Sequence, residues 1–171
     1  MIDSFVRLPV CESAYGYHEA VWNVVRKTPD DKRKFLFRVI DAGDKVVARI
    51  RFMESISNCG VAVRYPLGGE SVKFSLLFSL NPEDVRNGWI EPGSVEHWLR
   101  SRFADRGAHI SHVSLSFLPW MLFGKKGHKW KFPQILAQGE IHITDPNGVK
   151  RLLDEGLGRA RGFGFGLMEI D

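Results

Sequence analysis

The sequence is short of cysteine, of long apolar runs and of metal-binding motifs. Cys11 and Cys59 are its only cysteines, and their spacing matches no metal-ligand motif, which indicates a reducing cytoplasm and no zinc. The six histidines are scattered, without an HxxxH or HxH pair on an expected helix. No apolar run is long enough to span a membrane, and no signal peptide is recognisable. We therefore expect a cytoplasmic protein with no membrane segment, no metal and no cofactor.

The sequence also lacks the glycine motifs that bind nucleotide cofactors. Its glycine-rich stretch, residues 156–166, does not end in Gly-Lys-Ser/Thr, so it is not a P-loop. In a dinucleotide fingerprint the glycines lie between a strand and a following helix, whereas here we expect a helix before them and a strand after them. Nothing resembles a Ser-His-Asp arrangement, and no group of carboxylates suggests a metal site. The function must therefore be sought in other residues.

A strong excess of one sign of charge is missing as well. Lys and Arg number 24 against 20 Asp and Glu, which gives a formal net charge of +4. This mildly basic balance permits a polyanionic partner without proving one. With 171 residues the chain is long enough for one domain or two small ones, and to bury roughly 70% of its unfolded surface.

The order of the expected elements repeats along the chain. In the first half we expect a helix at residues 15–27 and strands at residues 5–10, 35–40, 46–52 and 61–65. In the second half we expect helices that begin after Ser94 and Asp145, and strands at residues 72–80, 109–118, 134–144 and 162–167. This order predicts an α+β protein of tandem ferredoxin-like (RRM-like) β-α-β-β-α-β folds, the first with a reduced second helix. Residues 66–70 form the expected linker, so we predict domains at residues 1–66 and 71–171.

Two of the expected helices carry clear caps and an apolar face. Ser13 is the expected N-cap of the first helix, whose predicted core residues are Tyr17, Val21, Val24 and Val25. Asp145 is the expected N-cap of the last helix, with Pro146 at its first position and Gly156 at its end. The core face of that helix is predicted to consist of Val149, Leu152 and Leu153.

The most unusual stretch is the glycine-rich one that follows this last helix. Glycine alternates with apolar residues from Gly162 to Leu167, which predicts a strand with one apolar face and one face without side chains. Such a bare face lets a helix or a phosphate chain lie against the backbone. The alternative is a closing strand that is merely rich in glycine. The candidate RNA-binding residues here are Gly158, Gly162, Gly164, Arg159 and Arg161.

The segment from Arg161 to Phe165 also matches the first five residues of the RRM signature, Arg-Gly-Phe-Gly-Phe. We interpret this match as partial coincidence. It still indicates that a glycine-and-aromatic segment with a basic neighbour suits RNA.

Tyr15 and His18 are the candidate catalytic residues. They stand three residues apart on the expected first helix and therefore share a face. An imidazole titrates near ~6.5 and can both take and give a proton at neutral pH, and a phenol nearby can orient the ring or bind a phosphate. A histidine beside an aromatic residue on a helix surface explains the same spacing, and the spacing alone favours that simpler interpretation.

A basic hairpin is expected at residues 123–133, which read FGKKGHKWKFP. Two glycines let it turn, and an aromatic residue is interleaved with its lysines. Four lysines on a protruding ribbon suit insertion along a nucleic-acid groove, where they replace condensed counterions. A solvated loop explains them equally well. The candidate RNA-binding lysines are Lys125, Lys126, Lys129 and Lys131.

Three stretches, in order, carry a family resemblance. The first is YGYHEAVW at residues 15–22 with FLFRV at residues 35–39, the second is GEIHITD at residues 139–145, and the third is GLGRARGFGFGL at residues 156–167. Together they resemble the CasE family, the CRISPR repeat-RNA endoribonucleases of the RAMP superfamily that serve the E-subtype Cascade complex. The likeness runs from Phe5 to the C-terminus.

The resemblance implies two ferredoxin-like folds, binding of a CRISPR repeat RNA stem-loop and one metal-independent cut at its base. It implies catalytic roles for Tyr15 and His18, and Cascade-type effector subunits as partners. The sequence departs from the family at residues 53–69, which are trimmed, and at Asn23, where some relatives have a lysine. The alternative is a non-catalytic RAMP-type subunit, which would keep the glycine-rich stretch and the basic hairpin but would not need His18.

Overall fold

The computed structural model describes residues 1–25, 35–41, 45–52, 60–80, 91–125 and 128–171. The first half of the chain forms the sheet β2-β3-β1-β4, and the second half forms the sheet β6-β7-β5-β8, with neighbouring strands antiparallel in both. The elements of the first half are β1 (Ile2–Leu8), α1 (Ala14–Val25), β2 (Leu36–Asp41), β3 (Val46–Phe52) and β4 (Val61–Ala62). Those of the second half are β5 (Ser71–Phe78), α2 (Pro92–Ala104), β6 (Ala108–Lys125), β7 (His128–Ile143), α3 (Pro146–Glu155), the 3₁₀ helix η2 (Arg161–Phe163) and β8 (Met168–Ile170).

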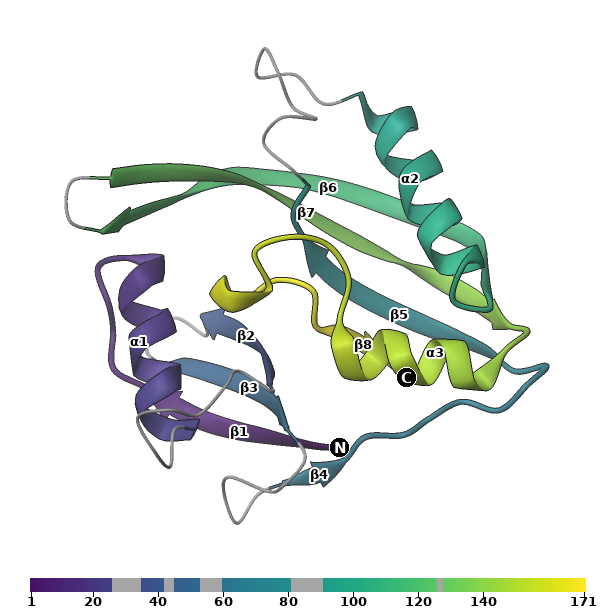
Figure 1. The fold of residues 1–171 in the computed structure, drawn as a ribbon, viewed down its shortest axis with the longest axis horizontal. Helices are drawn as coiled ribbons and strands as arrows, with labels where there is room; N and C mark the ends of the chain where they lie inside the picture. Colours follow the sequence, from purple (N-terminus) through teal and green to yellow (C-terminus); the bar gives the residue numbers. More distant parts are fainter. Residues whose placement is uncertain (26–34, 42–44, 53–59, 81–90, 126–127) are drawn as a thin grey trace.

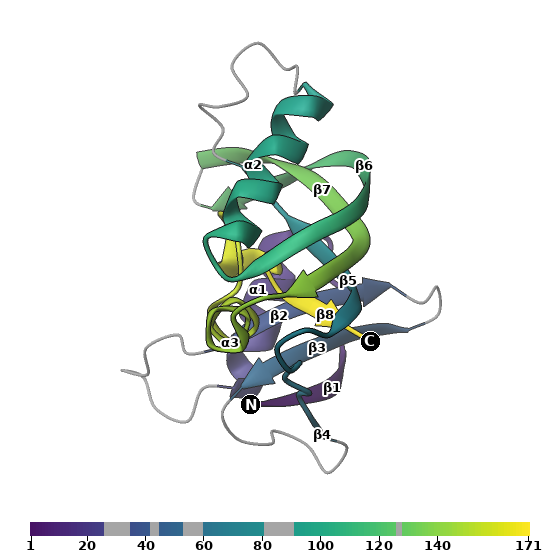
Figure 2. The ribbon, with the colours of Figure 1, turned by 90° about the vertical axis from the view of Figure 1, so that its right-hand side faces the viewer.

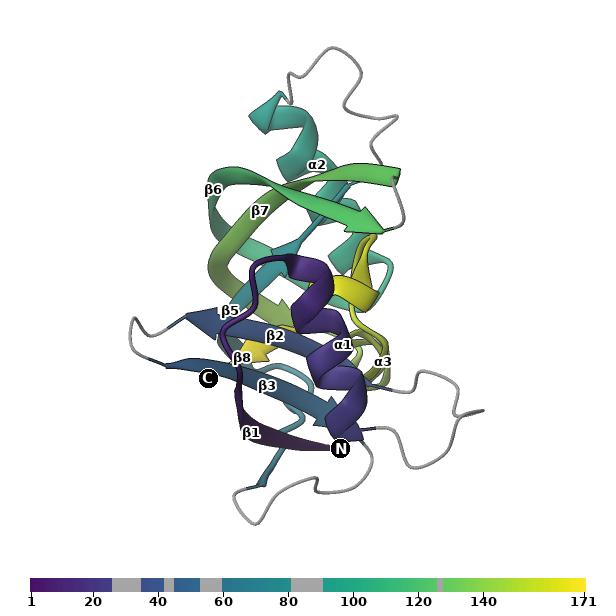
Figure 3. The same cartoon turned by 90° about the vertical axis from the view of Figure 1, so that its left-hand side faces the viewer.

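Both sheets have the strand order of a ferredoxin-like fold, which confirms the predicted fold class (Figure 1). Helix α1 covers one face of the first sheet, and α2 and α3 pack on one face of the second sheet. The two side views show the second sheet and α2 stacked over the first sheet (Figures 2 and 3). The predicted second helix of the first half falls on residues outside those that the structure describes. The domain boundary between residues 66 and 71 stays a prediction.

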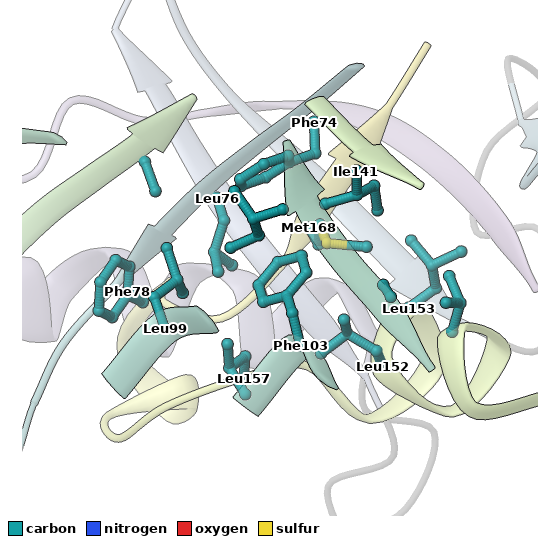
Figure 4. Close-up of a cluster of buried hydrophobic side chains, with 14 of the residues drawn as sticks. Phe74, Leu76, Phe78, Leu99, Phe103, Ile141, Leu152, Leu153, Leu157 and Met168 are labelled. Atoms are coloured by element: carbon teal, nitrogen blue, oxygen red, sulfur yellow. The ribbon is translucent and has the colours of Figure 1, made fainter. Parts of the chain in front are cut away.

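The caps of α1 and α3 form as the sequence predicts. The amide of Gly16 donates to the Ser13 hydroxyl (3.1 Å), and the amide of Asn147 donates to the Asp145 carboxylate (3.0 Å). Helix α3 ends at Gly156, whose φ of +74° favours glycine. Of the predicted core residues of α1, Val21 and Val25 are buried, one turn apart on the helix. The prediction for Val24 is wrong, because it points to one side of that buried face and is 39% exposed. The side chains of α2 and α3 interdigitate with those of the second sheet in one core (Figure 4).

The prediction that Ser94 caps α2 is wrong. The helix begins at Pro92, and its N-cap is Glu91, which makes no side-chain cap hydrogen bond. The Ser94 hydroxyl instead donates to the Glu91 carboxylate (3.1 Å). A proline is well tolerated at the first helical position because its missing N–H has no partner there.

Strands β6 and β7 extend well beyond their predicted ends and form a long hairpin past the body of the sheet (Figure 1). The first of the two predicted strands ends at Leu118 and the second begins at Gln134, next to Pro119 and Pro133 respectively. In the structure the ladder shifts register between Leu118 and Met121 and then continues. A register shift of this kind accommodates a proline, which cannot donate to the ladder.

The strand predicted at residues 162–167 is also wrong. The chain makes the single 3₁₀ turn of η2 there, and the closing strand β8 starts only at Met168. Gly164 and Gly166 have φ values of +93° and +83°, which an extended strand cannot contain. The alternation of glycine and apolar residues reflects turns between buried residues, since Phe165 and Leu167 are both buried.

Arg51 on β3 joins the two sheets from a buried position. Its guanidinium donates to both carboxylate oxygens of Asp3 on β1, at 2.7 and 2.9 Å. Its remaining Nη1 donates to the carbonyl oxygens of Leu153 (3.1 Å) and Met168 (2.7 Å) in the second half. Burial raises the pKa of the Asp3 carboxyl, but the hydrogen bond and charge of Arg51, and then Arg49, outweigh it and lower the pKa below its ordinary value.

We expect Arg51→Met to lower the free energy of unfolding by about 3–5 kcal/mol, because it leaves the buried Asp3 carboxylate with Arg49 as its remaining arginine partner and removes the donor to the carbonyl oxygens of Leu153 and Met168. Urea unfolding measures this loss. Arg64→Met is the control, because Arg64 is 57% exposed in its ion pair with Glu70 and should contribute at most about 1 kcal/mol. Changing Asp3→Asn together with Arg51→Met should recover part of the loss, and equal losses for Arg51→Met and Arg64→Met would contradict the role of the buried pair.

Candidate active site

His18 lies half-buried on α1 and faces the glycine-rich loop, residues 156–167. Its Nδ1 is hydrogen-bonded to the carbonyl oxygen of Gly162. The centroid of its ring is 5.7 Å from that of Tyr15, 6.2 Å from that of Trp22 and 5.1 Å from that of Phe163. The structure therefore brings the two candidate catalytic residues together with a loop that lies far away in the sequence.

The contact with Gly162 determines which nitrogen of His18 can act as a base. A carbonyl oxygen only accepts hydrogen bonds, so Nδ1 must carry a proton to bond to it. In the neutral ring Nε2 is then the basic nitrogen, and in the cation it is the nitrogen that can release a proton. This is the arrangement in which a backbone carbonyl orients a histidine that acts as a general acid or base.

Phe163 holds the loop in place between α1 and the long hairpin. Its ring centroid lies 4.3 Å from that of Phe123 on β6 and 6.1 Å from that of Phe132 on β7. The loop can be followed between α1, β2 and the hairpin in Figures 1 and 3. His18 thus contacts an aromatic cluster whose members come from both halves of the chain.

Close approaches of the backbone explain two of the loop glycines. A Cβ on Gly166 would lie 2.6 Å from the carbonyl oxygen of Leu157, and one on Gly164 would lie 3.3 Å from the ring of Phe37. Contacts within the protein therefore occupy the space beside Gly164 that the sequence suggested for RNA or a helix. Gly162 contributes its carbonyl oxygen to His18.

Arg159 and Arg161 do not join Tyr15 and His18. Together with Gly158 they line a separate hollow of about 370 Å³ beside α2. The guanidinium of Arg161 donates to the carbonyl oxygen of Glu155 (2.6 Å) at the end of α3. The RNA-binding candidates of the glycine-rich loop are therefore divided between two sites.

The predicted basic hairpin is the far end of β6 and β7. Lys131 is exposed and pairs with Leu122 in the ladder, and the backbones of Lys125 and Lys129 pair with His128 and Gly124. Lys126 and the side chains of residues 124–129 lie outside the described part of the structure. The hairpin thus carries Lys131 on a strand that extends beyond the sheet.

Sequence reasoning missed the contacts that orient His18. A carbonyl oxygen has no signature in a sequence, and Gly162 lies 144 residues from His18. In the described part of the chain, no group of three or more His, Cys, Asp or Glu residues could hold a metal ion. No helix among the described residues is long and apolar enough to cross a membrane.

A family model described as "CRISPR associated protein" matches residues 77–171, which is more than half of the chain. The chain belongs to the CRISPR-associated protein family. This membership agrees with the resemblance that the three sequence stretches carry. No curated protein matches this CRISPR-associated protein by sequence.

Several solved structures share the fold of this CRISPR-associated protein over nearly their full length. The crystal structure of Cas6e from Escherichia coli str. K-12 has a TM-score of 0.78 at 19% identity, covering 99% of this chain and 98% of that one. A structure of the CRISPR endoribonuclease Cse3 bound to 19 nt RNA has a TM-score of 0.79 at 16% identity, covering 99% of each chain. A chain of E. coli Cascade bound to a PAM-containing dsDNA target has a TM-score of 0.60 at 17% identity, covering 99% and 97%.

We expect Gly166→Ala to destabilise the protein more than Gly69→Ala does. Both glycines have a φ of +83°, so each alanine should cost roughly 1–2 kcal/mol of backbone strain. Only at Gly166 would the new methyl group also meet a backbone oxygen, whereas Gly69 has nothing within 4 Å. Urea unfolding of the two variants isolates the contact. Equal losses would show that the loop can move aside, and that its close packing does not fix its position.

Proposed function

We propose that this protein is an endoribonuclease that cuts CRISPR repeat RNA at the base of its stem-loop to give mature crRNA. The observation that carries the proposal is the His18 ring, held by the carbonyl oxygen of Gly162 beside Tyr15. The family membership and the fold shared with Cse3 and Cas6e support it.

RNA supplies its own nucleophile, because each 2′-hydroxyl lies next to the phosphate that it attacks. The attack is intramolecular, so proximity is already provided. The protein needs only to align the 2′-oxygen, the phosphorus and the 5′-oxygen, to move protons and to stabilise the developing charge. We propose a metal-independent reaction on this basis, with a 2′,3′-cyclic phosphate and a 5′-hydroxyl as its ends.

His18 is the proposed general acid or base, acting through Nε2. If Nε2 takes the proton of the 2′-hydroxyl, Nδ1 keeps its own proton and its bond to Gly162 throughout. The ring therefore does not have to turn during the reaction. Tyr15 is proposed to orient the ring or to bind the scissile phosphate. Some relatives have a lysine where this chain has Asn23, which is exposed on the same helix. A cation that binds the scissile phosphate would therefore have to come from another residue.

The long hairpin is the proposed second contact with the stem. A-form RNA has a major groove too deep and narrow for side chains to read its bases, so lysines there would meet mainly phosphates. The candidates remain Lys125, Lys126, Lys129 and Lys131. We also propose that the protein assembles with Cascade-type effector subunits, since a chain within E. coli Cascade has the same fold.

Labelled repeat RNA incubated with the protein in excess EDTA tests the function as a whole. A single discrete cut with the proposed end groups supports the metal-independent enzyme. Binding without a cut would instead support a non-catalytic RNA-binding subunit, and a cut only after a divalent metal is added would contradict the proposed chemistry.

We expect His18→Ala to lower the single-turnover cleavage rate roughly 10²- to 10⁴-fold, as for the loss of one acid–base group. Binding of the repeat RNA should change little, because one neutral side chain adds little affinity. The matched control is His97→Ala, since His97 is exposed on α2. Tyr15→Phe removes the hydroxyl and keeps the aromatic ring, so it measures the contribution of the hydroxyl alone. Near-normal cleavage by His18→Ala would remove His18 from the mechanism.

We expect Lys131→Ala to weaken binding of the stem-loop and to reduce its salt dependence, because one phosphate contact is lost. The slope of log affinity against log salt should fall by roughly 0.7–0.9. The loss should be similar for stems of different sequence, since phosphates carry no sequence information. Lys73→Ala, which removes an exposed lysine from β5, is the control. An unchanged slope for Lys131→Ala would place Lys131 away from the RNA.

A further inference from the structure

A hollow of about 370 Å³ lies on the side of the glycine-rich loop that faces α2. Two of its arginines come from the loop, Arg159 and Arg161, and two come from α2 and the residues after it, Arg102 and Arg106. Trp98 and Gly158 complete the wall between them. Sequence reasoning singled out only the loop arginines, because α2 lies more than fifty residues earlier in the chain.

The charge of this hollow is strongly one-sided. Four guanidinium groups line it, and no acidic residue among the described ones does. The nearest ion pairs are those of Arg106 with Glu155 (3.2 Å) and Arg102 with Asp105 (3.7 Å), and both carboxylates are more than half exposed. Even with these two carboxylates counted, the four arginines leave the hollow with a net positive charge. A concave surface lined by one sign of charge concentrates the field and attracts the opposite ion.

The structural needs of the fold explain only part of this cluster. Arg161 binds the last carbonyl of α3, and Arg106 pairs with Glu155, so both stabilise the end of that helix. Arg102 lies over the ring of Trp98, 5.8 Å from its centroid. No hydrogen bond or ion pair of the Arg159 side chain occurs among the described residues. Arg159 thus makes no such structural contact through its side chain in that part of the chain, and the ion pair of Arg102 with Asp105 is exposed and contributes little stability.

The hollow and the proposed active site lie on either side of one short segment of chain. Arg161 lines the hollow, and the next residue, Gly162, holds His18. Neighbouring Cα atoms are only about 3.8 Å apart. RNA bound at His18 would thus lie next to the segment that carries Arg159 and Arg161, which line the hollow together with Arg102 and Arg106. By contrast, the larger cavity that Phe163 lines is mainly apolar and is also lined by Glu12, whose carboxylate would repel a phosphate.

We propose that this hollow binds backbone phosphates of the single-stranded RNA that adjoins the stem, with Arg102 and Arg106 completing the site of Arg159 and Arg161. The proposal rests on the proposed function for the position of the cut. Arginine suits this ligand because its guanidinium binds phosphate oxygens in pairs. The strand that enters the hollow is the one on the 5′ side or the 3′ side of the stem, and the chemistry is the same for both.

The test compares three RNAs that carry a 2′-deoxy substitution at the cut site, so that binding is measured without cleavage. They are the bare stem-loop, the stem-loop with a 5′ single-stranded extension and the stem-loop with a 3′ extension. Binding to wild type, Arg102→Gln and Arg106→Gln is followed by fluorescence anisotropy at several salt concentrations. Arg151→Gln is the matched control, because Arg151 is exposed on α3 and does not line the hollow.

We expect one extension to tighten binding to wild type, and each substitution to reduce that gain roughly two- to fivefold, as for an exposed charge pair. The salt slope for that RNA should fall by roughly 0.7 for each arginine lost. Arg102→Lys, which keeps the charge but loses the paired donors, should fall between wild type and Arg102→Gln. Arg151→Gln should behave as wild type.

Losses of equal size on all three RNAs would place the arginines on the stem, and no loss on any RNA would make them purely structural; either result overturns the proposal. Failure of the proposed function has a different signature, in which wild type neither binds nor cuts the stem-loop. In that case the single-stranded extension alone serves as the probe. Binding that depends on Arg102 and Arg106 would then still support the hollow, and binding independent of them would overturn it.

Discussion

One guanidinium group fixes both ends of the glycine-rich loop. The Nη1 atom of Arg51 donates to the carbonyl oxygen of Leu153, just before the loop, and to that of Met168, just after it. Asp3 holds the same guanidinium from the opposite side. Because Arg51 and Asp3 belong to the first sheet, the loop is positioned relative to α1, which packs on that sheet. The alignment of Gly162 with His18 follows from this connection.

Because the loop is positioned in this way, both halves of the chain contribute residues to the candidate site. The first half supplies Tyr15 and His18, and the second half supplies the carbonyl that orients the ring and the hairpin proposed to bind the stem. Further ion pairs, from Arg38 and Arg49 to Glu169 on β8, join the same two sheets at 3.5 and 3.3 Å. Together with the hydrogen bonds of Arg51, these pairs give the junction several polar contacts beside its apolar packing.

Features that depend on neighbouring residues could be predicted from the sequence. The caps at Ser13 and Asp145 and the end of α3 at Gly156 are local, and the repeated order of elements gave the fold class. The full length of β6 and β7 was not predicted, and a register shift accommodates Pro119 and Pro133 within the long hairpin. The glycine-rich stretch was misleading, because alternation in a sequence does not reveal the sign of φ.

The candidate site could be predicted only in part. Tyr15 and His18 were candidates because they share a face of one helix and because the family resemblance implies a role for them, and that role stays a prediction. Arg51 carries a charge and would ordinarily be assigned to the surface, although it is among the most buried side chains described. Its partners, like the partner of His18, come together only through the tertiary structure. The pairing of the α2 arginines with those of the loop is invisible in the sequence for the same reason.

The separation of His18 from Gly162 by 144 residues also has a meaning during synthesis. A ribosome makes the helix with the histidine early and the orienting carbonyl late, so the hydrogen bond between Nδ1 and Gly162 is absent while the chain is being made. Closing so long a loop costs conformational entropy, which the contacts of the intervening elements offset. The hydrogen bond that orients His18 therefore forms only after the second half of the chain has been made and has folded.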